Sequence, residues 1–119
     1  MNTKSIGDLG EAAAVKLLKR KGFKILETNY FMSFGEIDII AKNKKTLVFV
    51  EVKTRKSDEF GKPGDAVGRS KQKRIIMVAN HYISTFEEDL DVRFDVIEVT
   101  ADGNKVSAIN HIEGAFICK

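Results

Sequence analysis

The chain has 119 residues, of which 43% are apolar and 31% are charged, and this predicts a single globular domain over residues 1–119. No apolar run reaches the ~18 residues that cross a bilayer, and the N-terminus lacks the continuous apolar segment of a secretory signal. A single cysteine, Cys118, excludes internal disulfides and cysteine-based zinc clusters. We therefore expect a cytoplasmic protein.

The charge of the chain is distributed unevenly, although the net charge is only +3. Residues 42–74 hold eleven lysines and arginines against four acids, whereas residues 81–119 hold three against eight. Such an asymmetry in a small domain favours a basic surface that faces a polyanion. A solvated run of charges is the alternative interpretation.

The first third of the chain predicts a helix followed by a strand. Apolar residues recur at helical spacing from Ile6 to Leu17, and Gly22 follows a basic last turn, so we expect a helix over residues 5–21. Residues 23–30 read as the first strand.

The middle of the chain predicts a β-hairpin and then a long loop. Residues 36–41 and 46–54 are rich in β-branched side chains and are separated by a short turn of asparagine and lysine. Residues 55–69 contain three glycines and the one proline of the chain. Loops of this length are uncommon in compact domains unless they have a function.

The last third predicts a second helix over residues 70–86 and a strand over residues 92–99, with a further strand over residues 105–112 left open. The element order is then α-β-β-β-α-β-(β). A helix between the third and fourth strands allows a parallel crossover there. We expect an α/β fold with a mixed central sheet flanked by helices.

The hairpin brings two acids together if its turn has an even number of residues. The register that pairs Asn43 with Thr46 also pairs Asp38 with Glu51, and directly opposed Cβ atoms lie about 4.5–5.5 Å apart. Carboxylates at that distance repel each other unless a cation lies between them, and Mg²⁺ or Mn²⁺ would serve. A three-residue turn would shift the register and separate the two acids.

Three further residues are candidates for the same site. Lys53 shares the strand face of Glu51, where an ammonium could orient a water or stabilise developing negative charge. Glu11 borders the apolar stripe of the first helix and either reaches the same metal or is an ordinary solvated glutamate. Gln72 interrupts the apolar stripe of the second helix and either caps that face or bonds a site residue or a phosphate.

Several other residues complete the prediction. Five cations flank the predicted site and are candidates for phosphate contacts without base specificity: Arg55, Lys56, Arg69, Lys71 and Arg74. His81 and His111 are interpreted as structural or surface residues, because they are distant in sequence and lack a metal-binding spacing. Asp95 is interpreted as structural, because it lies within a predicted strand.

The motifs resemble those of the YraN-like family of small bacterial proteins, which are often labelled endonucleases. The matching segments are Gly10-Glu11, GEIDIIA (35–41), LVFVEVKTR (47–55), GKPGDAV (61–67), KQKRI (71–75) and HIEGAF (111–116). The chain is also similar, more weakly, to the archaeal Holliday junction resolvases. Both groups carry the PD-(D/E)xK signature of restriction-endonuclease-like proteins.

The resemblance implies a restriction-endonuclease-like fold and Mg²⁺-dependent cleavage of phosphodiester bonds. Position by position, it assigns Asp38 and Glu51 as the motif acids, Lys53 as the motif lysine, Glu11 as the helix glutamate and Gln72 as the polar residue of the following helix. The sequence departs from the pattern where Ile37, instead of proline, precedes the aspartate.

Three functions follow as hypotheses. The first is a metal-dependent nuclease that acts on DNA, including branched or flapped structures, for which a homodimer would suit a symmetric junction. The second is a nucleic-acid-binding module that keeps a vestigial site. The third is an interaction protein whose acidic C-terminal third docks a partner.

Overall fold

The computed structural model describes residues 6–56 and 67–116, which form two helices and five strands. In chain order these are α1 (Ile6–Arg20), β1 (Lys24–Met32), β2 (Gly35–Asn43), β3 (Thr46–Lys56), α2 (Arg69–Ile83), β4 (Asp91–Asp102) and β5 (Lys105–Phe116). The predicted order of elements is confirmed, and the strand left open by the sequence is present as β5.

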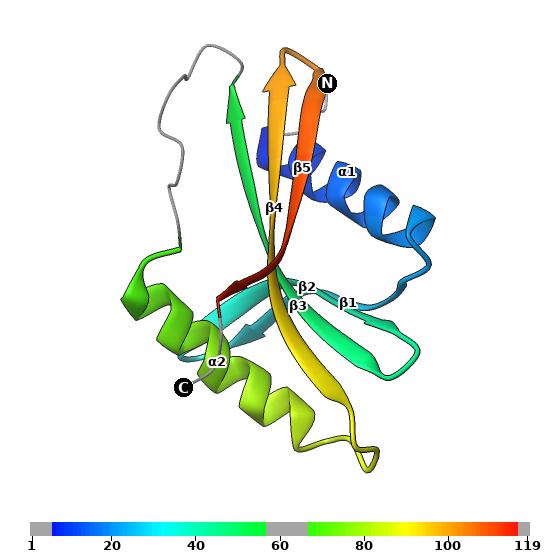
Figure 1. Ribbon diagram of the computed structural model, residues 1–119. Coiled ribbons are helices and arrows are strands. Elements are labelled where there is room, and N and C mark those ends of the chain that lie inside the picture. The colour runs from blue at the N-terminus through cyan, green and yellow to red at the C-terminus, as the bar shows by residue number, and fades with distance from the viewer. Residues whose placement is uncertain (1–5, 57–66, 117–119) are drawn as a thin grey trace.

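The five strands form one mixed sheet in the order β1-β2-β3-β4-β5. Neighbouring strands are antiparallel except β3 and β4, which run parallel and are connected through α2. Figure 1 shows the twist of this sheet and the two helices on different sides of it. The expected α/β fold with a mixed sheet between helices is therefore confirmed.

The hairpin of β2 and β3 has the predicted register. Its turn consists of Lys44 and Lys45, with Lys44 at a φ of 56°, as a two-residue hairpin turn requires. Asn43 pairs with Thr46, and the ladder continues as far as Ile39 and Val50. The next step along the two strands brings Asp38 to the level of Glu51, just beyond the last ladder pair.

β3 separates the two hydrophobic cores and contributes to both. Leu47 and Phe49 join the cluster beneath α2, whereas Val48 and Val50 join the cluster beneath α1. A strand buried on both faces is apolar along its length, and this explains the continuous run that precedes Glu51. Glu51, the one acid of β3, therefore lies where the buried part of the strand ends.

The second helix is shorter than predicted. It ends at Ile83 instead of residue 86, because Ser84 and Thr85 turn the chain and donate their hydroxyls to the carbonyls of His81 and Tyr82. Phe86 nevertheless packs against the core beneath α2, and this contact explains why it fits the helical apolar pattern.

The predicted loop over residues 55–69 is only partly tested. Residues 55 and 56 belong to β3, and Arg69 begins α2. Residues 57–66 lie outside the described residues.

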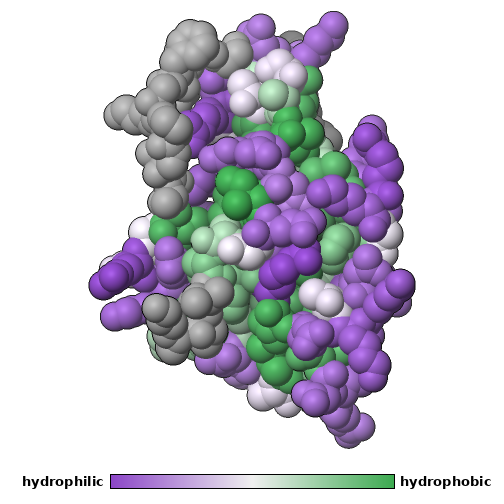
Figure 2. Space-filling view, in the orientation of Figure 1, coloured by the Kyte–Doolittle hydropathy of each residue, from purple (hydrophilic) through white to green (hydrophobic). Residues whose placement is uncertain are grey.

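Hydrophilic side chains cover much of the face seen in Figure 2, with smaller apolar patches between them. Large apolar side chains at the surface include Phe31 on β1 and Met77 on α2, which are 73% and 52% exposed. Neither of the described helices is long and apolar enough to span a membrane.

Candidate functional site

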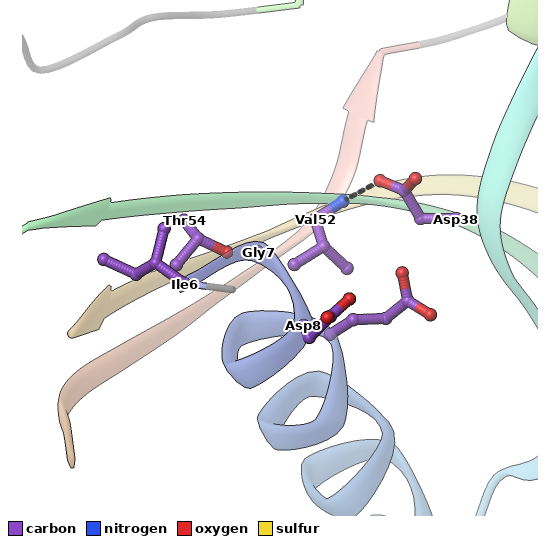
Figure 3. A pocket seen from close by; sticks show the side chains of 7 residues that line it. Ile6, Gly7, Asp8, Asp38, Val52 and Thr54 are labelled. Carbon is purple, nitrogen blue, oxygen red and sulfur yellow. Dashed lines mark hydrogen bonds between the residues drawn. The ribbon is translucent and has the colours of Figure 1, made fainter. Parts of the chain in front are cut away.

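The site begins where β2 and β3 stop pairing. Beyond Ile39 and Val50, the Asp38 carboxylate replaces a backbone acceptor, and its Oδ2 accepts the N–H of Val52 at 2.8 Å. Figure 3 shows this bond and the Asp38 side chain lying against β3. The bond fixes the carboxylate between the two strands as they separate.

Glu51 lies beside Asp38 and changes its protonation. Burial is the main cause that raises the pKa of Asp38 to about 6, and the negative charge of Glu51 adds to it. The N–H of Val52 and the ammonium of Lys71 act in the opposite direction. The two acids that the register brought together therefore interact electrostatically, and the positive charge of Lys71 offsets their repulsion only in part.

Glu51 is buried and is ion-paired from above by α2. Its side chain is only 7% exposed, and its Oε2 contacts the Nζ of Lys71. The sequence placed Lys71 among the phosphate contacts, but here its ammonium neutralises the second acid of the pair. The spacing of residues along the strands could not predict this contact, because the lysine extends to β3 from a helix.

Lys53 lies two residues after Glu51 on β3 and shares its face of the sheet by strand alternation. It is half-buried, and its Cα pairs in the parallel ladder with that of Glu98 on β4. Arg55, two residues further on, forms an ion pair with the same glutamate, with 3.7 Å between Nη2 and Oε2. Glu98 is thus a neighbour of the candidate lysine that sequence patterns did not indicate.

A cavity of about 330 Å³ opens beside Asp38 between α1 and β3. It is lined by Ile6, Gly7, Asp8, Glu11, Asp38, Val52 and Thr54. Figure 3 shows Asp8 on the first turns of α1, facing the strand that carries Val52. The cavity places three carboxylates around one space.

The structure places Glu11 on this cavity, close to where the sequence expected it. Its Oε2 accepts the Nδ2–H of Asn29 at 2.9 Å, and Asn29 adopts a φ of 51° in β1. Asp8 was missed by sequence analysis. Its spacing of three residues from Glu11 put both acids on one helical face and could have indicated it.

Gln72 is not placed against the acids by any contact in the described structure. Its Nε2 donates to the carbonyl of Val67 at 2.7 Å, and this bond links the first turn of α2 to a residue two positions before the helix begins. The bond is the local capping role that the sequence left open beside a site role.

The remaining cations of the prediction lie on the two elements that carry Glu51 and Lys71. Lys56 at the end of β3, and Arg69 and Arg74 on α2, have exposed side chains. Arg74 also packs its Cβ close to Gly35, where an added Cβ would lie 3.3 Å away. The start of α2 is therefore both basic and in close contact with β2.

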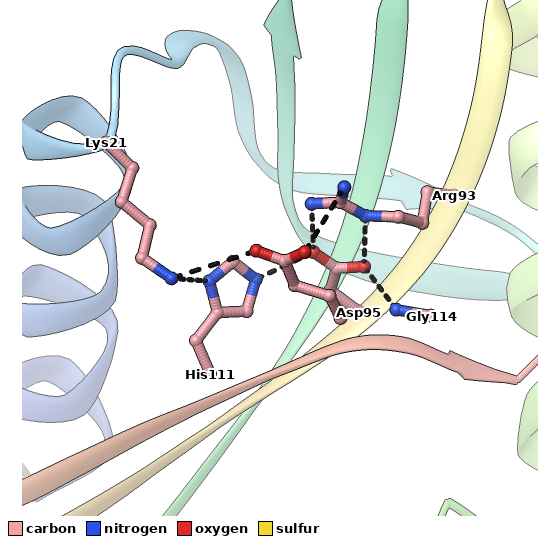
Figure 4. Close-up of polar contacts among 6 residues, drawn as sticks. Lys21, Arg93, Asp95, His111 and Gly114 are labelled. Carbon is pink, nitrogen blue, oxygen red and sulfur yellow. Dashed lines mark hydrogen bonds and ion pairs between the residues drawn. The ribbon is translucent and has the colours of Figure 1, made fainter.

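A second polar cluster lies away from the acid pair and holds the C-terminal strand. Asp95 is fully buried and accepts two bonds of 2.9 Å from Arg93, one of 2.7 Å from His111 and one of 3.0 Å from the N–H of Gly114. Figure 4 shows Lys21, the residue just after α1, bonded to the other nitrogen of the His111 ring. The bonds to Asp95 raise the pKa of Arg93. This satisfied network supports the structural interpretation of Asp95 and His111.

The capacity of the described residues for a metal ion is limited to paired carboxylates. Within residues 6–56 and 67–116, no three acidic, histidine or cysteine side chains converge closely enough to hold an ion together. Asp38 and Glu51 offer two adjacent carboxylates, and further ligands would have to come from water or substrate.

The fold and the site define a class of small mixed α/β protein in which one strand carries an acid and a lysine and its neighbour carries a second acid. Residues 10–99 match a family described as "Uncharacterised protein family UPF0102". The chain belongs to this family, which is the YraN family, so the resemblance seen in the motifs is confirmed.

Relatives of the chain are similar over almost its whole length. A UPF0102 protein of Caldicellulosiruptor bescii is 49% identical over 119 residues, covering 98% of this chain and 100% of the relative. One from Alkaliphilus oremlandii is 50% identical over 116 residues, covering 95% and 98%. One from Clostridioides difficile is 49% identical over 117 residues, covering 98% and 100%.

Proposed function

We propose that this protein is a cytoplasmic, metal-dependent nuclease. Its substrate would be DNA, including branched or flapped structures, in which it hydrolyses phosphodiester bonds. The observation that carries the proposal is the acid pair at the end of the β2–β3 ladder. Asp38 is held there by the N–H of Val52, and Glu51 beside it helps to raise its pKa to about 6. Two coupled carboxylates beside a cavity form a site for a cation.

The residues present fit Mg²⁺ or Mn²⁺. Burial and, after it, the negative charge of Glu51 disfavour ionised Asp38 and raise its pKa, and a dication would favour the ionised form of both acids. Mg²⁺ is commonly bound by one or two protein carboxylates, while waters and substrate phosphate complete its shell. A site with two direct carboxylates is therefore sufficient, and Asp38 and Glu51 would supply them.

The neighbouring side chains have distinct roles in the proposal. When bound, the metal would supply Lewis-acid stabilisation of charge on the phosphate. Lys53 would orient the attacking water and stabilise the charge that develops on phosphorus-bound oxygens. Glu11 would hold water in the cavity beside Asp38. Hydrolysis forms a bond from the water oxygen to phosphorus, breaks one phosphorus–oxygen bond, and moves a proton from water to the leaving oxygen.

Binding of the DNA backbone is assigned to the basic residues around the site. Arg55, Lys56, Arg69 and Arg74 lie on the end of β3 and on α2, where they can contact phosphates without reading bases. A symmetric four-way junction would call for two copies of the chain.

The proposal predicts that cleavage depends on the acid pair and the lysine. Linear, flapped and four-way DNAs are incubated with Mg²⁺ or Mn²⁺ and either wild type or the variants Asp38→Asn and Lys53→Ala. We expect each variant to reduce the cleavage rate by about 10²-fold or more, as loss of a transition-state-stabilising group does. Asparagine can still accept the Val52 N–H, so Asp38→Asn separates charge from folding.

Matched controls remove the same charges elsewhere. Lys45→Ala alters the hairpin turn at the other end of β3, and Asp102→Asn alters the exposed end of β4. Cleavage that survives equally in wild type, Lys53→Ala and Asp38→Asn comes from a contaminant and would refute the proposal.

A second function is favoured by one observation, the ion pair between Lys71 and Glu51. A site already neutralised by an ammonium is what a non-catalytic nucleic-acid-binding module with a vestigial site would keep. This alternative predicts salt-sensitive DNA binding that Glu51→Gln leaves unchanged, together with no cleavage of any DNA in the panel.

A further inference from the structure

The contact between Lys71 and Glu51 joins an exposed side chain to a buried one. The Lys71 side chain is 48% exposed, whereas that of Glu51 is 7% exposed. Lys71 is the third residue of α2, so its ammonium reaches down from the start of the helix into the gap beside β3. A buried carboxylate needs a positive partner, and this lysine supplies one.

The cations at the start of α2 are unfavourable for the stability of the helix itself. Its first turn contains no acid, and the preceding Gly68 makes no side-chain capping bond. Arg69, Lys71 and Lys73 thus lie at the positive end of the helix dipole, where anions are favoured and cations are disfavoured. Negative partners outside the helix, either Glu51 or a phosphate, would offset this unfavourable placement.

We propose that Lys71 is an exchangeable internal cation, which occupies Glu51 in the free protein and turns outward to a nucleic-acid phosphate when a divalent ion binds. The inference rests on the proposed function, because it assigns the divalent ion to Asp38 and Glu51. An ammonium and a dication cannot both occupy the gap without repelling each other. The half-exposed lysine can leave along the helix surface, whereas the two strand-borne acids cannot.

Exchange makes Lys71 a competitor of the metal. If the ion pair is formed about nine-tenths of the time, it weakens apparent metal affinity about tenfold. Titration calorimetry with Mn²⁺ at constant ionic strength compares wild type, Lys71→Ala and Lys73→Ala. We expect Lys71→Ala to bind Mn²⁺ about tenfold more tightly. Lys73→Ala removes the same charge from the same helix and should change affinity less than twofold.

The outcomes separate this inference from the nuclease proposal. Binding by wild type that Lys71→Ala leaves unchanged or weakens overturns the role of Lys71 and leaves the metal site intact. Equal strengthening by Lys71→Ala and Lys73→Ala also overturns it, because net charge alone would then explain the effect. Failure of every variant to bind overturns both the inference and the metal site.

A second readout requires no change at Lys71 and so does not depend on that variant folding. An amine-reactive reagent is applied briefly with and without Mg²⁺, and modification of Lys71 is quantified by mass spectrometry. We expect Mg²⁺ to increase the modification rate in wild type severalfold. In Glu51→Gln the rate should already be high and insensitive to Mg²⁺, while Lys73 reports general effects of the ion. An unchanged rate at Lys71 under saturating Mg²⁺ refutes the exchange.

Discussion

Asp38 combines two tasks in one side chain. Its carboxylate closes the β2–β3 ladder by accepting the N–H of Val52, and it also faces the charge of Glu51. The bond from Val52 requires a hydrogen-bond acceptor at position 38. The closeness of Glu51 is unfavourable once both acids are ionised. The site therefore holds an electrostatic cost that depends on pH.

The protonation of Asp38 predicts a stability that falls as pH rises. Burial and Glu51 raise its pKa from 3.8 to about 6 in the folded protein. Between about pH 4 and 6 the folded state retains a proton that the unfolded chain has released, so stability decreases across this window and is lowest above it. We expect a loss of about 1–3 kcal/mol in metal-free buffer, measured by urea unfolding at pH 4.5 and 7.

The variant Asp38→Asn isolates this contribution. Asp38→Asn should remove most of the decrease in the free energy of unfolding between pH 4.5 and 7. Asp102→Asn, on the exposed end of β4, should retain this decrease. Titrating groups that do not contact Asp38 are shared by wild type and Asp38→Asn, so their contributions cancel in that comparison. An identical pH dependence in wild type and Asp38→Asn would show that Asp38 titrates normally.

The sequence predicted residue positions where backbone geometry determines them. An even turn was enough to bring Asp38 to the level of Glu51, because cross-strand register follows from turn length. It could not predict that Lys71 meets Glu51, because that contact depends on how α2 is placed over the sheet. Nor could it predict that Glu98 neighbours Lys53, because parallel register across a crossover is not set by a turn.

At the level of elements, the position of Glu11 depends on how closely α1 approaches β3. Gly10 is buried at this contact, and a Cβ added there would lie 1.8 Å from Oγ1 of Thr54. Absence of a side chain is thus required for the helix to reach the strand. The neighbouring residue, Glu11, is delivered to the cavity by the same approach.

This contact predicts the sign of a substitution that helix propensity alone would get wrong. Gly10→Ala should gain up to about 1 kcal/mol from helix propensity. Overpacking against Thr54 typically costs about 1–3 kcal/mol. We expect a net destabilisation of about 1–2 kcal/mol in urea unfolding, with reduced cleavage because Glu11 shifts. Combination with Thr54→Ala should recover part of the stability. A more stable Gly10→Ala would show that the helix moves freely.

Element types were predicted well because both helices and the core strands carry clear periodicity. The errors lie at ends, where one residue can satisfy two patterns. Phe86 continues the apolar stripe of α2 and still packs on the core, yet the helix has already ended at Ile83. Side-chain bonds from Ser84 and Thr85 decide the end, and periodicity does not describe them.

On the scale of the whole molecule, the uneven charge of the sequence places cations on the elements next to a half-buried aspartate and a buried glutamate. Cations at the end of β3 and the start of α2 lie on the chain segments that lead to and from Glu51. A polyanion attracted by these cations would meet the acids only with a divalent ion between them. Binding and metal loading are therefore expected to support each other.

Salt dependence tests which cations contact phosphates. Each phosphate contact contributes about −0.9 to the slope of log affinity against log salt for duplex DNA. We expect Arg69→Ala to make this slope less negative by about 1, measured by fluorescence anisotropy with Ca²⁺ in place of Mg²⁺. Lys105→Ala, at the turn between β4 and β5, should leave the slope unchanged. Equal slopes for all three proteins would exclude Arg69 from the interface.

The bond from Val52 to Asp38 has a consequence for descent within the family. Because the Asp38 carboxylate completes a strand ladder, we expect selection for folding to retain it even in a lineage that has lost catalytic activity. Substitution of Asp38 by an aliphatic residue would leave the N–H of Val52 without its acceptor where β2 and β3 separate. Position 53 carries the ammonium that hydrolysis is proposed to use. The residue at this position therefore distinguishes catalytically active family members from inactive ones better than the aspartate does. A member with the aspartate intact and the lysine replaced would be the signature of a protein that has kept the architecture and abandoned the reaction.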